Sequence, residues 1–108
     1  MATAGYMEQL TDPIFKLDAL AINGEGERVP FSLSIFRGGI EELGHFCLVR
    51  CPYIRSRDLK IIGGDHEEAL ANAILFTESY LKNTGTRLVD HGGREVCLPP
   101  YEYTVEEP

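Results

Sequence analysis

The sequence predicts an α+β fold: an antiparallel sheet of about four strands plus a C-terminal hairpin, with one long helix packed on one face of the sheet. Three observations predict it: short segments in which apolar and polar residues alternate, turn residues between them, and one stretch, 65–83, with apolar residues at helical spacing. Alternation with a period of two indicates strands buried on one face, and a 3.6-residue period indicates an amphipathic helix. A length of 108 residues predicts a single domain, 1–108.

The first two expected strands form a hairpin. Residues 14–23 place their apolar side chains on one face, namely Phe15, Leu17, Ala19 and Ala21. After the turn-like NGEGER, residues 30–36 do the same with Phe31, Leu33 and Ile35, while Ser32 and Ser34 lie on the other face. This pattern predicts two half-buried strands whose apolar faces need a cover.

Two further strands are expected in the middle of the chain. A polar loop is predicted over residues 38–44, and the third strand follows at residues 45–51. After an arginine-rich bend, residues 59–62 predict a short fourth strand.

The helix has both of its ends marked in the sequence. Asp65 is a good N-cap, and Glu68 stands three residues later in a capping-box relation. Asn83 and Gly85 supply a stop signal. The apolar stripe between them is the only one wide enough to cover the sheet, and we expect Leu70 and Ile74 to be buried against it.

The C-terminal part predicts a second hairpin followed by a tail. Residues 87–90 and 94–98 flank His91, Gly92 and Gly93, which read as a turn. Two prolines then end the second arm, and residues 99–108 form an acidic tail.

The histidine and cysteines of the third strand raise the question of a metal or redox site. His45, Cys47 and Cys51 share one face of an extended segment, which separates Cys47 from Cys51 by about 13 Å. That distance is too long for a disulfide or for a shared zinc ion. We therefore expect no metal and no disulfide, although Cys97 could still complete a site with His45 and Cys47.

The charge balance limits the partners. The chain has 10 basic and 17 acidic residues, a formal charge of −7, which disfavours nucleic acid and anionic membranes and favours a basic protein. No signal peptide and no membrane-spanning stretch is evident, so the expected location is the cytoplasm. No nucleophile has an evident activating partner, so we expect no catalytic residues, no cofactor and no enzyme activity.

Two kinds of surface are candidates for binding a partner. Acidic clusters could steer a basic partner, and they comprise Glu41 and Glu42 in the 38–44 loop and Glu102, Glu106 and Glu107 in the tail. The basic bend after the third strand offers the competing surface, and it contains Tyr53, Arg55 and Arg57. Arginine and tyrosine are favoured anchors of interfaces.

Short motifs of the chain resemble those of a group of short bacterial domains of unknown function. They are Arg50-Cys51-Pro52-Tyr53 at a strand end, Gly64-Asp65 opening a helix with Glu68-Ala69-Leu70, and a closing hairpin that ends in Leu98-Pro99. The resemblance covers residues 15–99 and implies a sheet with one helix on it. It implies no catalytic residues. The basic bend and the acidic tail depart from the pattern of that group.

Two functional hypotheses follow. The first is a protein-binding module, in its most concrete form a bacterial immunity or antitoxin-like protein that covers the active site of a basic toxin. The alternative is a small-molecule or metal-dependent enzyme or sensor that uses the region of His45, Cys47 and Cys97.

Overall fold

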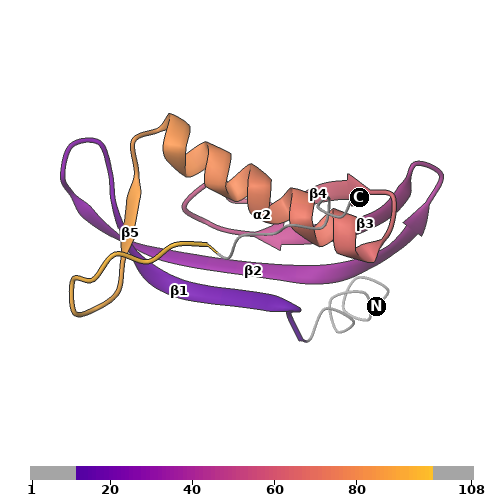
Figure 1. Ribbon diagram of the computed structural model, residues 1–108, viewed down its shortest axis with the longest axis horizontal. Coiled ribbons are helices and arrows are strands. Elements are labelled where there is room, and N and C mark those ends of the chain that lie inside the picture. The colour runs from indigo at the N-terminus through magenta and orange to yellow at the C-terminus, as the bar shows by residue number, and fades with distance from the viewer. Residues whose placement is uncertain (1–11, 99–108) are drawn as a thin grey trace, which may run out of the picture.

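The computed structural model describes residues 12–98 as one antiparallel five-stranded sheet with one helix across it (Figure 1). The elements are β1 (Phe15–Ile22), β2 (Arg28–Glu41), β3 (Gly44–Arg50), β4 (Leu59–Gly63), α2 (His66–Asn83) and β5 (Arg87–Val89). The strand order is β4-β3-β2-β1-β5. The predicted fold class is confirmed.

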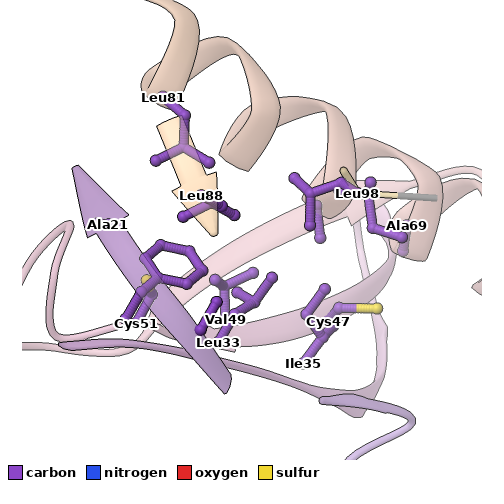
Figure 2. Packing of buried hydrophobic residues seen from close by; sticks show 14 residues of the cluster. Ala21, Leu33, Ile35, Cys47, Val49, Cys51, Ala69, Leu81, Leu88 and Leu98 are labelled. Carbon is purple, nitrogen blue, oxygen red and sulfur yellow. The ribbon is translucent and has the colours of Figure 1, made fainter. Parts of the chain in front are cut away.

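The strand register confirms the predicted faces of β1 and β2. Leu17 pairs with Leu33, and Ala19 pairs with Phe31, so these apolar side chains lie on the same side of the sheet. β3 and β4 continue that side with Val49, Cys47 and Ile61. Figure 2 shows Leu33, Cys47 and Val49 of this face gathered beneath α2.

Helix α2 is capped as the sequence predicts. A side-chain oxygen of Asp65 accepts a hydrogen bond from the backbone N–H of Glu68 at 2.8 Å. The Glu68 carboxylate in turn accepts one from the backbone N–H of Gly64 at 2.6 Å, one residue earlier than in a standard capping box. Gly85 follows the helix end with a φ of +68°.

The helix covers the face of the sheet formed by β2, β3 and β4. Its buried side chains include Ala69, Ala73, Ile74 and Leu81, and Leu70 packs against the same cluster. The predicted packing of the helix on the sheet is therefore confirmed.

The prediction of a polar loop over residues 38–44 is wrong. β2 instead continues to Glu41, with an irregular register between Arg37 and Ile40, and only Glu42 and Leu43 form the turn to β3. Gly38 lies so close to the aromatic ring of Phe46 that any added Cβ would overlap it. The glycine pair here forms a β-bulge, which glycine permits, and does not end the strand.

The C-terminal hairpin forms in part. Its first arm is β5, which adds to the main sheet beside β1. A side-chain oxygen of Asp90 organises the turn by accepting hydrogen bonds from the backbone N–H groups of Gly92 and Arg94. The second arm pairs with β5 through a bridge between Val89 and Glu95 and a hydrogen bond from the Val96 N–H to the Leu88 carbonyl at 2.8 Å, but it does not form a regular strand. The chain leaves the ladder and buries Leu98 in the main core (Figure 2).

Candidate functional site

The end of the β2–β3 hairpin is the most exposed apolar feature of the described residues. We call Ile40, Glu41, Glu42 and Leu43 the hairpin tip. Ile40 is 70% exposed and Leu43 is 78% exposed, more than any other large apolar side chain in residues 12–98. Exposed apolar residues framed by charged ones are typical of a protein-binding surface.

Glycines at the base of the hairpin hold the tip in place. Gly44 has a φ of +132°, and an added Cβ there would come within 2.5 Å of the carbonyl oxygen of Gly63. The β-bulge between Arg37 and Ile40 changes the register just before the tip. In Figure 1 the hairpin projects at the right of the view, beyond the N-terminal end of α2.

The two acidic residues of the tip are in different situations. The Glu41 carboxylate accepts hydrogen bonds from Nζ of Lys60 at 2.8 and 2.7 Å, and this ammonium lies 4.7 Å from the centre of the Phe46 ring. Glu42 is exposed in the turn itself. Glu42 therefore contributes more to the negative field around the tip than Glu41 does.

The structure separates the basic bend from the hairpin tip. The bend follows the last residue of β3, whereas the tip precedes its first residue, so the two surfaces lie at opposite ends of the same strand. Arg55 and Arg57 are exposed. Glu102, Glu106 and Glu107 lie outside the described residues.

Tyr53 is part of the fold. Its ring packs edge-on against Phe31 with a centroid distance of 5.8 Å, and its hydroxyl lies 3.1 Å from the hydroxyl of Thr86. Tyr53 thus links the bend to the core, and because it is only partly buried it also lines a surface pocket together with Pro52 and His91. At the start of the bend, Arg50 forms a two-point ion pair with Asp58 at 3.0 Å for each bond.

The region of His45, Cys47 and Cys97 is the place where the sequence left a metal site open as an alternative. Cys47 is 1% exposed on the core face of β3, whereas Cys97 is exposed. Residues 12–98 contain no group of three or more histidine, cysteine, aspartate or glutamate side chains arranged to hold a metal ion. What the region does contain is a contact between His45 and His66, with 3.2 Å between Nδ1 and Nε2.

The sequence did not predict this histidine contact. Both residues lie near Gly63, because His45 pairs with Gly63 across β3 and β4, and His66 is the first residue of α2. The short Gly63-Gly64 connection was the only sequence signal that could have suggested it.

Within the described part of the chain, no helix is long and apolar enough to cross a membrane. Comparison of the chain with protein-family models, curated proteins and solved structures finds no match. The functional argument therefore depends on the residues and their geometry.

The burial of the cysteines gives a first testable prediction. Burial is the main cause that raises the pKa of the Cys47 and Cys51 thiols, and it also blocks access to them. Exposed Cys97 should therefore react with a thiol reagent such as DTNB at least about tenfold faster than either buried cysteine in the native protein.

Cys97→Ser provides the control for this prediction. The variant should lose the fast phase, and denaturation of the parent should make all three cysteines react. A fast phase that persists in Cys97→Ser would show that Cys47 or Cys51 is accessible, and would favour a chemical role for the β3 cysteines.

Proposed function

We propose that the chain is a protein-binding module and that the hairpin tip is its principal contact surface. The exposure of Ile40 and Leu43 carries this proposal. Large side chains that become fully buried on binding supply most of the affinity of typical interfaces, and polar neighbours around them exclude water. A narrow projecting tip of this kind fits into a cleft better than onto a flat surface.

The charge of the chain supports a basic partner. The net charge of −7 and exposed Glu42 would speed the encounter with a positively charged protein. A tip that enters a basic cleft would occlude it, which is how an immunity or antitoxin-like protein neutralises a toxin. We therefore propose a bacterial protein of this class as the most concrete form of the function.

Loss of the apolar side chains of the tip should weaken binding to the partner. The candidate partner is the protein encoded by the adjacent reading frame, and its affinity is measured by surface plasmon resonance. The double variant Ile40→Ser, Leu43→Ser should raise Kd about 10- to 100-fold, mainly through faster dissociation, because two side chains that exclude water are removed.

Leu75→Ser is the matched control, since Leu75 is an exposed leucine on α2 far in sequence from the tip. Its Kd should equal that of the parent. Arg55→Ala with Arg57→Ala, and removal of residues 99–108, report on the basic bend and the acidic tail. If the tip variant binds like the parent while the arginine variant binds weakly, the bend is the interface and our assignment is wrong.

A further inference from the structure

The two histidines that meet at the base of the hairpin belong to different elements. His45 lies near the start of β3 and His66 begins α2. Their ring centroids are 4.2 Å apart with an angle of 74° between the planes, and Nδ1 of His45 lies 3.2 Å from Nε2 of His66. At that distance only one hydrogen can lie between the two nitrogens.

The remaining nitrogen of His66 decides where that hydrogen belongs. Nδ1 of His66 is buried and has no hydrogen-bond partner among the described residues. A buried N–H without an acceptor is costly, and an N–H at this nitrogen would have none. The favoured arrangement therefore has His66 donating from Nε2–H to Nδ1 of His45, with both rings neutral.

Counting the hydrogens shows what a further proton would do. The neutral pair has one hydrogen between the rings and one on Nε2 of His45. A third hydrogen has two possible places. It can occupy the buried Nδ1 of His66, or Nδ1 of His45 and Nε2 of His66 can each carry a hydrogen, in which case the two rings must move apart. The closed contact is thus compatible with the neutral rings and opposes protonation.

The groups around the pair act in the same direction overall. The pKa of His66 is lowered, first by burial, then by the positive charges of Arg37 on β2 and of His45, while Asp65 opposes them. Cys47 on β3 and Glu67 on α2 line the same small pocket, of about 110 Å³, as His66, and the negative charge of Glu67 acts with Asp65 against the lowering. The positive end of the α2 dipole further disfavours a charged ring at the first helical position.

The contact also sits next to the hairpin tip. His45 pairs with Ile40, a residue of the tip, on one side and with Gly63 on the other, one pair beyond the Glu41–Gly44 pair that closes the hairpin. Movement of the His45 ring would therefore change the surroundings of Ile40.

We propose that the His45–His66 contact is a pH-sensitive connection that holds the base of the β2–β3 hairpin against the start of α2 when the His66 ring is neutral and opens when it is protonated. The stabilisation is complete above the ordinary histidine pKa of about 6.5, and is lost as pH falls through the lowered pKa of His66. In the proposed function, acid would weaken partner binding at the tip. That consequence depends on the proposed function, whereas the contact itself can be tested without any partner.

The test uses the isolated protein in urea denaturation between about pH 7.5 and about pH 5.0. Unfolding takes up protons in this range. The equilibrium constant of unfolding should therefore rise as the pH falls, by up to about tenfold per pH unit for each proton taken up. His66→Gln should lose most of this rise. His91→Gln, which removes an exposed histidine from the β5 turn, should keep it.

Two measurements on the parent protein keep the test informative if His66→Gln does not fold. Long-range ¹⁵N–¹H NMR spectra should show the hydrogen of His66 on Nε2 at about pH 7.5. Hydrogen exchange, corrected for its intrinsic pH dependence, should show protection lost in acid at residues 44–46 and in the first turn of α2. A hydrogen on Nδ1, or the same pH dependence in His66→Gln as in the parent, would overturn the proposal.

Zinc binding is the remaining competing outcome. Two nitrogens 3.2 Å apart are close to the spacing of ligands on one ion. Titration with ZnCl₂ should give no stoichiometric binding. Binding of about one ion per chain that is lost in both His45→Gln and His66→Gln would assign the pair to a metal and overturn the proposal.

Discussion

Gly63→Ala is expected to lower the free energy of unfolding by about 3 kcal/mol or more, close to the upper end for overpacking. An ideal Cβ at Gly63 would stand 2.3 Å from the backbone nitrogen of Ala69 and 2.7 Å from its Cα. These are backbone atoms of α2, so no side-chain rotation relieves the overlap. The first turns of the helix would have to move off β4, and with them the contact between His45 and His66.

Gly24→Ala is the matched control for this prediction. Its added Cβ would meet only the carbonyl oxygen of Thr84, at an ordinary distance of 3.6 Å. Its effect on stability should stay within about 1 kcal/mol of the parent. The measurement is urea denaturation followed by circular dichroism. Equal midpoints for the two variants would show that α2 does not approach β4 as closely as the structure has it.

The parts of the fold that the sequence predicts are those set by local patterns. Alternation along β1 and β2 assigns Leu17 and Leu33 to one face, because a strand has only two faces and one of them must be buried. The helix boundaries follow in the same way from Asp65 and Gly85, whose effects act over a few residues.

The parts that it does not predict depend on contacts between distant residues. Gly38 and Gly39 have the composition of a loop, but β2 continues through them to pair with β3, and the ring of Phe46 packs on Gly38. The second arm of the C-terminal hairpin does not form a regular strand, and Leu98 at its end is buried in the main core, a contact between residues distant in sequence.

The candidate site shows the same division. The sequence locates Glu41 and Glu42 as a surface feature, but it places Ile40 and Leu43 in a polar loop where their exposure carries no meaning. The bulge and the two-residue turn that project them are tertiary features. The meeting of His45 and His66 likewise needs β3, β4 and the start of α2 to be assembled.

Phe31→Ala is expected to lower the free energy of unfolding by about 3–5 kcal/mol. Phe31 is 1% exposed on the core face of the central strand β2, opposite Ala19. Neither Ala19 nor the rigid sheet can fill the volume of the lost ring, so a cavity remains. The edge-on contact with Tyr53 at 5.8 Å is lost as well, and it contributes about 0.5–1.5 kcal/mol in typical aromatic pairs.

Two further variants separate these contributions. Phe31→Leu keeps most of the apolar volume and loses the aromatic contact, so it should lower the free energy of unfolding by about 1–2 kcal/mol. Phe15→Ala removes the same ring from the partly buried start of β1, on the same face of the sheet, and should be clearly milder than Phe31→Ala because water already reaches that position. Urea denaturation of the three variants gives the order. If Phe15→Ala proves as damaging as Phe31→Ala, the core is not centred on β2.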